Sequence, residues 1–565
     1  MISTVANSLW LASCVPELAR FRRDACQVAH AQRAVLHRIL TENAGTEFGS
    51  SNGFPAIRSV AEYQKRVPLR DYDQHKAWID RAAAGVPNVL TRQRVRLFEP
   101  TSGSSGATKL IPYTSSLRHE FQRGIRAWIA NLLWHCPSLL AGQAYWSVSP
   151  PGGEVEKTSG GIPIGFDDDT SYVGGWQQRL VKAVMAVPGS VQLAGDIDAF
   201  RYATLVFLVR SRNLRLISVW NPTYLSLLLD RLPEWGDRIC YDLAHGVFCP
   251  ADTRRAREVR TAIRADSPQE RFARLWPKLG LISCWKDANA EGPAAKLTQC
   301  FPHVRIQGKG LIATEAFISF PLIDHEQAAL AIRSHFLEFF PIDCDRPLLA
   351  DQLDRGGLYT VAVTTGGGLY RYVLGDLVEV TGHFRGCPLI RFVGRQYSVS
   401  DWFGEKLNEA HACRVLQETF RALGMVPSFA MLACDTDSSP GYVLYIDAAG
   451  HDELTERAAK MVDVGLRENF HYNYARQLGQ LECVRAFRVH GGADRYLATA
   501  ARNGQKLGDI KMPALDRRGG WSGVFGQIMP DRCQDTEQHT SCGALGTHAK
   551  AIPPRPTDAL LNPPR

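Results

Sequence analysis

The sequence predicts an α/β protein: a large N-terminal domain of layered sheets and helices, followed by a small α+β domain. A chain of 565 residues is too long for one hydrophobic core, so two or three domains are expected. Up to Arg395, apolar strand-like runs alternate with helical runs, which is typical of parallel α/β layers. Beyond it, short strands and helices alternate over about 120 residues. We expect domains at 1–395 and 396–515, and a poorly structured, polar and Pro-rich tail at 516–565.

The composition is that of an ordinary globular protein, with 45% hydrophobic and 22% charged residues. The net charge of +8 comes from scattered Arg and Lys, without a basic cluster interleaved with aromatic residues, so no nucleic-acid partner is expected. The fourteen cysteines form no C-x-x-C pair, as in a reducing compartment. The apolar run Ser8–Leu18 lacks a basic region before it, and no run is long enough for a bilayer. We expect a cytoplasmic protein without a signal peptide or membrane partner.

The first 45 residues have helical periodicity, with an apolar stripe from Leu18 to Leu40 that Gln32 interrupts. A short strand is expected at Val95–Phe98, and a helix begins near Leu117. Between them lies Thr101-Ser-Gly-Ser-Ser-Gly-Ala-Thr-Lys109, with two glycines, five hydroxyl side chains and one lysine. Such a loop can direct backbone N–H groups and hydroxyls at a polyphosphate while the lysine neutralises charge. A Ser/Gly-rich surface loop explains the composition equally well. It is not a Walker A loop, in which Gly and Lys are adjacent.

Further strands are expected at 144–149, 214–220, 279–285 and 304–306, and loops at sheet ends are where α/β proteins place ligands. Near these strand ends lie five residues that could wall a substrate pocket or simply pack in the core: Tyr145, Trp146, Trp220, Asn221 and Thr223.

Two acidic residues follow apolar strands. Thr314 and Glu315 come together at the end of one strand, where a hydroxyl could touch a phosphate and a carboxylate could hold Mg²⁺. Asp376 follows a glycine at the turn of an expected β-hairpin, where it could accept ribose hydroxyls. Taken singly, each is explained as well by a solvated acid or an Asx turn.

Four motifs in order resemble one family, the auxin-responsive acyl acid amido synthetases of plants and their bacterial relatives, a branch of the adenylate-forming superfamily. These motifs are Thr101–Pro112, Ile312-Ala-Thr-Glu315, Leu369-Tyr-Arg-Tyr-Val-Leu-Gly-Asp376 and Phe392-Val-Gly-Arg395. The resemblance covers roughly residues 15–515 and is closer to the bacterial members. It implies a large adenylate-forming domain and a mobile C-terminal lid domain. A carboxylic acid would react with ATP to give an acyl-adenylate and pyrophosphate, and an amine, usually that of an amino acid, would then take the acyl group.

The resemblance also implies roles for individual residues. Lys511, in Asp509-Ile-Lys-Met-Pro513, would be the mobile lysine that assists adenylation, with Lys506 as second choice, and a hinge would lie near 395–400. Glu315 would ligate Mg²⁺, and the remaining residues would contact ATP: Ser102, Gly103, Ser104, Ser105, Gly106, Lys109, Thr314, Asp376 and Arg395. The chain departs from plant members, which commonly have Ser-Ser-Glu in place of Ala313-Thr-Glu315, and a Gln and a Tyr before the lysine.

Two other functions are compatible with the sequence. The acyl group could pass to a thiol such as coenzyme A, or the chain could be a non-catalytic ligand-binding protein with a degenerate adenylating fold. The combination of Lys109, Glu315, Asp376 and Arg395 argues against the second of these, because a pure binder needs no carboxylate for Mg²⁺. A monomer or weak oligomer is expected.

Overall fold

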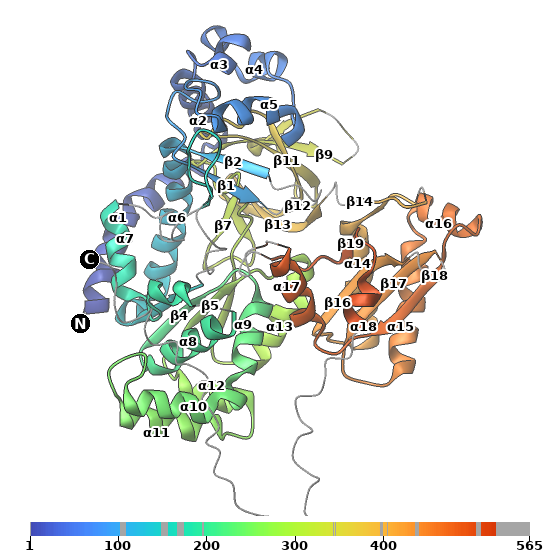
Figure 1. Ribbon diagram of the computed structural model, residues 1–565. Coiled ribbons are helices and arrows are strands. Elements are labelled where there is room, and N and C mark those ends of the chain that lie inside the picture. Colours follow the sequence, from blue (N-terminus) through green and yellow to red (C-terminus); the bar gives the residue numbers. More distant parts are fainter. Residues whose placement is uncertain are drawn as a thin grey trace, which may run out of the picture.

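The computed structural model of the chain describes residues 2–101, 109–147, 156–165, 175–194, 197–342, 344, 346–395, 399–403, 405–435, 440–503, 505 and 510–526. Within these ranges, three sheets have four or more strands, and helices pack around them (Figure 1). The predicted α/β class is therefore confirmed. Every described helix is too short or too polar to span a lipid bilayer.

The N-terminal helices cover the large part of the molecule. They are α1 (Ile2–Asp24), α2 (Val28–Glu42), α3 (Glu47–Ser51), α4 (Val60–Arg66) and α5 (Tyr72–Ala83). Gln32 interrupts the apolar stripe of α2 because its buried amide joins the helix to the chain around β9. Its Nε2 donates to the carbonyls of Ile332 (2.7 Å) and His335 (2.9 Å), and its Oε1 accepts from the N–H of Leu337 (2.8 Å). A polar residue at a core position is thus fully bonded, as burial requires.

A four-stranded parallel sheet forms the middle of the chain. It consists of β3 (Gln143–Trp146), β4 (Leu214–Ser218), β5 (Leu281–Cys284) and β6 (Arg305–Gly308), in spatial order β3-β4-β5-β6. The crossovers contain α7 (Gly175–Val184), α8 (Ile197–Arg210), α9 (Pro222–Asp230), α10 (Leu232–His245), α11 (Thr253–Ile263), α12 (Pro268–Leu275) and α13 (Glu291–Cys300). Because the strands are parallel, their carboxyl ends meet along one edge.

A seven-stranded sheet follows, and each of its strand pairs is antiparallel. Its spatial order is β10-β9-β11-β12-β13-β8-β7. The strands are β7 (Ser319–Pro321), β8 (Ala328–Leu330), β9 (Phe336–Pro341), β10 (Leu348–Leu349), β11 (Leu358–Thr364), β12 (Tyr372–Phe384) and β13 (Cys387–Arg395). The hairpin expected around 359–375 is the β11–β12 pair.

The region around the Ser/Gly-rich loop differs from the expected order of strand, loop and helix. β1 (Leu97–Thr101) pairs antiparallel with β2 (Lys109–Tyr113), so Lys109 opens a strand opposite Thr101 and does not end the loop. Helix α6 (Ser115–His135) then begins, with the hydroxyl of Thr114 as its N-cap. The five-residue strand β2 was missed because Pro112 within it favours a loop or a helix start.

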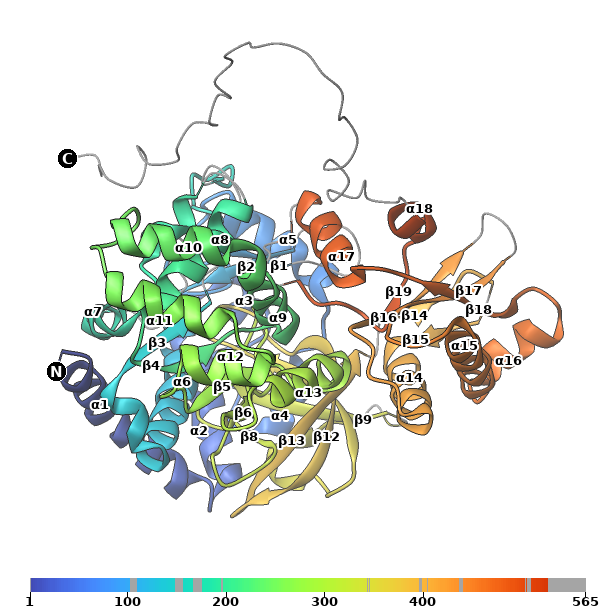
Figure 2. The ribbon, with the colours of Figure 1, turned by 90° about the horizontal axis from the view of Figure 1, so that it is seen from below.

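The C-terminal part has its own sheet, in spatial order β18-β17-β16-β19, and lies to one side of the other sheets (Figures 1 and 2). The strands of this sheet are β16 (Phe429–Asp435), β17 (Gly441–Asp447), β18 (Glu482–Arg488) and β19 (Leu515–Asp516). Before it, β14 (Val399–Ser400) and β15 (Leu407–Asn408) form a separate two-stranded sheet. The helices of the C-terminal part are α14 (Glu409–Leu423), α15 (Asp452–Leu466), α16 (Phe470–Gln477), α17 (Gly492–Arg502) and α18 (Trp521–Gly526). The boundary near residue 395 stays a prediction, since one apolar cluster contains side chains of both the parallel sheet and β16–β17.

Helix α14 begins at Glu409, because Asn408 ends β15 and caps the helix by accepting from the N–H of His411 (2.7 Å). The tail is not unstructured from residue 516 onward, because α18 buries Trp521 and Phe525 against β16, β17 and α17. Two buried aromatic rings outweigh the weak periodicity of this short segment.

Candidate active site

Lys109 is the first described residue after the Ser/Gly-rich loop, while Ser102, Gly103, Ser104, Ser105 and Gly106 lie outside the described residues. Its Nζ lies 5.5 Å from the centroid of the Tyr72 ring, a cation–π distance. The Tyr72 hydroxyl accepts a hydrogen bond of 2.8 Å from the N–H of Leu110, next to the lysine. Tyr72 starts α5, where the Asp71 capping box fixes it. Helix α5 therefore sets the position of the Lys109 amine, a contact between distant segments that the sequence did not reveal.

Thr314 and Glu315 occupy the turn of a tight hairpin and not a strand end as expected. Ile312 and Phe317 form an antiparallel bridge, and Ala313 and Ala316 exchange backbone hydrogen bonds of 2.9 and 3.3 Å across the turn. The Glu315 carboxylate accepts from the Tyr372 hydroxyl at 3.4 Å. Burial raises the pKa of Glu315, and the nearby Arg395 and Lys109 lower it. The carboxylate is thus poorly solvated and surrounded by cations, as expected of a group that holds a ligand.

Asp376 and Arg395 face each other on neighbouring strands. They are cross-strand partners in the β12–β13 ladder, and Arg395 Nε donates to Asp376 Oδ1 at 3.1 Å. Asp376 is buried. It lies in a β-bulge of β12 and not at a strand turn as expected. Thr360 on β11 pairs with Leu377 and Ala362 pairs with Val373, so the residues of β12 between these two pairs, Asp376 included, form the bulge. Gly375 has a φ of +77°, which favours glycine at this point. Bulges of this kind redirect side chains next to ligand sites.

Lys511 lies beside these residues although it is far away in the sequence. Its Nζ is 5.0 Å from the centroid of the Trp285 ring. Lys511 is exposed as a whole residue, and partial desolvation of its amine lowers the pKa of Lys511. Arg395 also lowers this pKa, while the carboxylates of Asp376, Glu315 and Glu409 act in the opposite direction. Lys506, the second choice for this role, lies outside the described residues, as do positions 396–398 of the expected hinge.

Two contacts hold the lysine segment against the rest of the site. Asn221 Nδ2 donates to the carbonyl of Ile510 at 3.1 Å, and the N–H of Ala514 donates to the Glu409 carboxylate at 3.2 Å. Lys511 is thus fixed from both sides, by the end of β4 and by the start of α14. Neither contact could be predicted, because each joins segments more than 100 residues apart.

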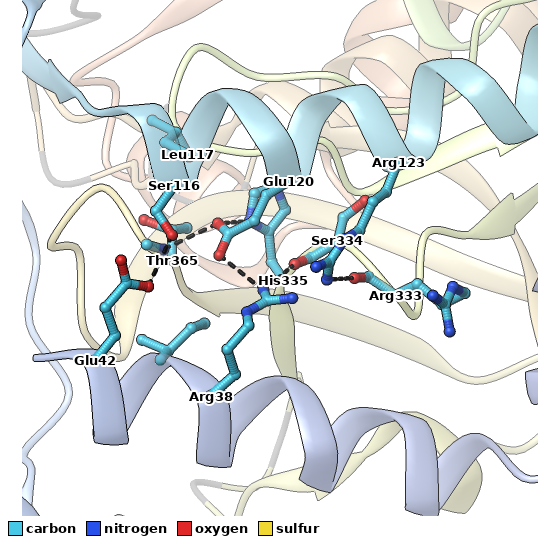
Figure 3. A network of polar contacts seen from close by, with 12 residues as sticks. Arg38, Glu42, Ser116, Leu117, Glu120, Arg123, Arg333, Ser334, His335 and Thr365 are labelled. Carbon is cyan, nitrogen blue, oxygen red and sulfur yellow. Dashed lines mark hydrogen bonds and ion pairs between the residues drawn. The ribbon is translucent and has the colours of Figure 1, made fainter. Parts of the chain in front are cut away.

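A buried polar network joins α2, α6 and the segment that contains His335 (Figure 3). The Glu120 carboxylate on α6 accepts from Arg38 (3.0 Å), from His335 Nδ1 (2.9 Å) and from the N–H of Gly366 (2.9 Å). His335 Nε2 accepts from the N–H of Phe317 at 2.9 Å, which assigns the proton to Nδ1. Glu120 therefore connects the helix after the Ser/Gly-rich loop to the hairpin that presents Glu315.

The five residues proposed to wall a pocket do not share one environment. Tyr145 is buried in the core on one face of β3, where its hydroxyl lies 3.2 Å from that of Tyr224. Trp146 packs on the other face, 5.9 Å from both Trp10 and Trp128. The remaining three follow β4. Asn221 caps α9 through the N–H of Thr223 (2.9 Å) and also reaches the carbonyl of Ile510, directly before Lys511. Thr223 is buried. The half-buried Trp220 approaches Lys511 through Trp285, whose ring centroid lies 5.9 Å away.

This fold is that of the acyl acid amido synthetases. The solved structure of GH3.15 acyl acid amido synthetase matches with a TM-score of 0.77 and 19% identity, over 88% of this chain and 93% of that one. A complex of AtGH3.15 acyl acid amido synthetase with 2,4-DB matches similarly, with a TM-score of 0.76 over 89% and 94% of the two chains.

The chain belongs to the GH3 family. The model of the GH3 family N-terminal domain matches residues 17–306, and that of the GH3 family central domain matches residues 328–395. Similar relatives include the indole-3-acetic acid-amido synthetase GH3.15 of Arabidopsis thaliana, 26% identical over 89% of this chain and 87% of the relative. A probable indole-3-acetic acid-amido synthetase, GH3.12 of Oryza sativa subsp. japonica, is 23% identical over 88% and 92%. The predicted family resemblance is thereby confirmed.

Proposed function

We propose that the protein is an ATP-dependent acid–amine ligase that first adenylates a carboxylic acid and then transfers the acyl group to an amine, most simply that of an amino acid. One observation carries the proposal: Lys109, Glu315, Asp376, Arg395 and Lys511 converge on one place from five separate segments. Three cations and two carboxylates at one junction suit a nucleoside triphosphate, whose phosphates need positive charge and whose ribose needs a hydrogen-bond acceptor. The names of the GH3 relatives support the same activity.

In the first step, a carboxylate oxygen of the acid attacks the α-phosphorus of ATP, and the bond from that phosphorus to the pyrophosphate oxygen breaks. The hydroxyls and N–H groups of the Ser/Gly-rich loop, with Lys109, would bind the β- and γ-phosphates. Thr314 would donate to the α-phosphate, and Asp376 would accept from the ribose hydroxyls. Lys511 would balance the negative charge that develops around the α-phosphate, which its position beside Glu315 and Asp376 favours.

The donor groups fit magnesium. Among the described residues, no group of three or more His, Cys, Asp or Glu side chains could hold a metal alone. Mg²⁺ usually takes one or two carboxylates and completes its shell with phosphates and water, so the single Glu315 carboxylate suffices when ATP is bound. Glu315 would hold the ion, which would neutralise phosphate charge, and Tyr372 would keep the Glu315 carboxylate in place.

In the second step, the amine nitrogen attacks the acyl carbon of the adenylate, the amide bond forms, and AMP leaves with the electrons of the broken carbon–oxygen bond. The amine must lose a proton in this step. We further propose that residues 1–395 form the adenylating domain and that 396–515 carry Lys511 to it for the first step only.

Exchange of labelled pyrophosphate into ATP tests the proposal. With Mg²⁺, the protein should catalyse exchange that depends on an added carboxylic acid, across a panel of aromatic, fatty and hydroxy acids. Aromatic acids come first, because relatives are named for indole-3-acetic acid and one structure holds 2,4-DB. No exchange with any acid would favour the ligand-binding alternative. With an active acid, the mass of the product distinguishes an amide from a coenzyme A thioester.

A further inference from the structure

Lys309 is a buried lysine at the carboxyl end of the parallel sheet, directly after β6. It is 5% exposed. Its Nζ donates to the Ser218 hydroxyl at 2.7 Å and lies 4.8 Å from the Trp220 ring centroid and 5.3 Å from that of Trp128. The amine is therefore enclosed by two indole rings and one hydroxyl. No role assigned so far to the site uses it.

This amine lacks the partner that a buried charge needs. Among the described residues, no carboxylate forms an ion pair with Lys309, and its one hydrogen bond uses one of three donors. Burial lowers the pKa of Lys309 to about 7, with only the Cys284 thiol acting in the opposite direction. Buried lysines are almost always paired, because desolvation of an unpaired ammonium costs several kcal/mol. A bound anion would supply the missing charge and the missing acceptors.

The surroundings of Lys309 form a polar row across the sheet. Trp146, Ser218, Ser283 and Gln307 are successive partners across β3, β4, β5 and β6. Trp128 on α6 covers this row, with its Nε1 donating to Gln307 Oε1 at 3.1 Å. The buried Ser283 hydroxyl has no hydrogen-bond partner within the part of the chain that the structure describes. A second unsatisfied polar group, on the strand next to Ser218, indicates that this row is built for a ligand and not for packing alone.

Two tryptophans connect this row to the proposed reaction centre. The Trp220 ring that lies over Lys309 is 5.9 Å from the Trp285 ring, and Trp285 lies 5.0 Å from the Lys511 amine. Both tryptophans are half-buried. Trp220 and Trp285 therefore lie between two lysines: Lys511, at the proposed reaction centre, and Lys309, which lies under Trp128 of α6.

We propose that Lys309, with Ser218 and Ser283, recognises a second carboxylate on the acyl substrate, so that the preferred acid is a dicarboxylic acid. This rests on the proposed function and narrows its substrate class. One carboxylate is activated beside Lys511, and the other pairs with the Lys309 ammonium while the organic part of the acid lies along Trp220 and Trp285. Acids with an amide or ester in place of the distal carboxylate leave the buried lysine unpaired and are poor substrates.

The test compares matched pairs of acids, each a dicarboxylic acid and its half-amide, in the pyrophosphate exchange assay. For the wild-type protein we expect kcat/KM for the best diacid to exceed that for its half-amide on the order of 10- to 100-fold, the range for a hydrogen-bonded charge pair. In Lys309→Met, which removes the charge and keeps the length, the preference should vanish through loss of diacid activity while the half-amide reacts as before. Lys286→Met, a lysine just after β5 without these contacts, is the control and should keep the preference.

The outcomes separate this inference from the proposed function. Exchange with monoacids but no diacid preference in the wild-type protein overturns the dicarboxylate assignment and leaves the ligase intact. The same holds if Lys309→Met keeps the full preference. Exchange with no acid at all overturns both. Because the wild-type comparison is decisive alone, misfolding of Lys309→Met would not leave the question open.

Discussion

The contribution of a single charged residue in this site depends on how far it is buried and on which charge it faces. The two ion pairs between β12 and β13 illustrate this. Arg395 and Asp376 form a pair in which the carboxylate is 3% exposed, whereas Arg391 and Glu379, elsewhere on the same ladder, are 50% and 26% exposed. The exposed pair is worth little, because solvent and salt screen it. The buried pair fixes an acceptor within the site.

Replacement of Asp376 by Asn should therefore weaken ATP binding. The amide leaves Arg395 without its counter-charge and accepts hydrogen bonds less strongly, which we expect to raise KM for ATP by about 10- to 100-fold, or ~1.5–3 kcal/mol. The measurement is pyrophosphate exchange as a function of ATP concentration. Glu379→Gln, which breaks the exposed pair, should change KM by less than about 2-fold. Equal effects of the two substitutions would rule out a specific role for Asp376.

The environment of Lys511 makes a prediction about pH. Its amine must be charged to balance the phosphates, and burial lowers its pKa. The charge is therefore lost at a lower pH than in a free lysine, and kcat/KM for ATP should fall over an alkaline range that begins below the pH at which a free lysine titrates. Lys511→Arg stays charged, so its lower activity should remain level over that range. An alkaline fall of the same shape in both proteins would show that another group titrates.

At the level of elements, the sequence predicted the elements with strong periodicity and missed those defined by distant contacts. The four parallel strands and the β11–β12 hairpin were predicted because apolar runs and turn residues mark them. The strand β2 and the bulge at Gly375–Asp376 depend on pairing with β1 and β11, which no local pattern encodes. Charged and hydroxyl side chains within motifs could be predicted as site residues from the sequence. Tyr72, Trp285 and Lys309 could not, because the residues that they contact come from other segments.

The hydrogen-bonded connection from Glu120 on α6 through His335 to the hairpin of Glu315 can be tested by its effect on stability. Glu120→Gln removes the charge that pairs with Arg38 and weakens the bond to His335, deep in the core. We expect a loss of stability of about 3 kcal/mol, since breaking a buried pair leaves an uncompensated charge. Thermal unfolding followed by circular dichroism measures it. Glu47→Gln, which breaks an exposed pair with Arg81 that solvent screens, should leave the melting temperature close to that of the wild-type protein. Similar melting temperatures for the two variants would contradict the network's role.

At the scale of the whole molecule, three sheets contribute to one site. Lys309 and Trp220 follow strands of the parallel sheet, Asp376 and Arg395 belong to the antiparallel sheet, and Lys511 precedes β19 of the C-terminal sheet. Asn221, which follows β4, donates to the carbonyl of Ile510. The C-terminal part itself holds the other side of the lysine segment, through Glu409 and through the N–H of Leu432, which donates to the carbonyl of Ala514 at 2.8 Å. A lysine segment held by the C-terminal part can move together with it, which suits a group needed in only one of two steps.

This arrangement predicts that the two half-reactions can be separated. Lys511→Ala should lower acid-dependent pyrophosphate exchange by a factor on the order of 100 or more, because it removes a charge that acts in the first transition state. Amide formation from supplied acyl-adenylate and amino acid should stay within about 3-fold of wild type. On the same preparation, the exchange rate is measured from labelled pyrophosphate that enters ATP, and the rate of amide formation from the mass of the product. Equal losses in both would mean that Lys511 stays at the site throughout.

The neighbouring rings of Trp220 and Trp285, between Lys309 and Lys511, should contribute a circular dichroism signal of their own. Trp220 and Trp285 lie 5.9 Å apart at an interplanar angle of 42°, so their electronic transitions couple and rotate polarised light as a pair. Each ring also touches one of the two amines. We therefore expect the circular dichroism of this pair to change on the proposed departure of Lys511 and on the proposed binding of an acid at Lys309. Both changes would be followed in time without attaching any dye.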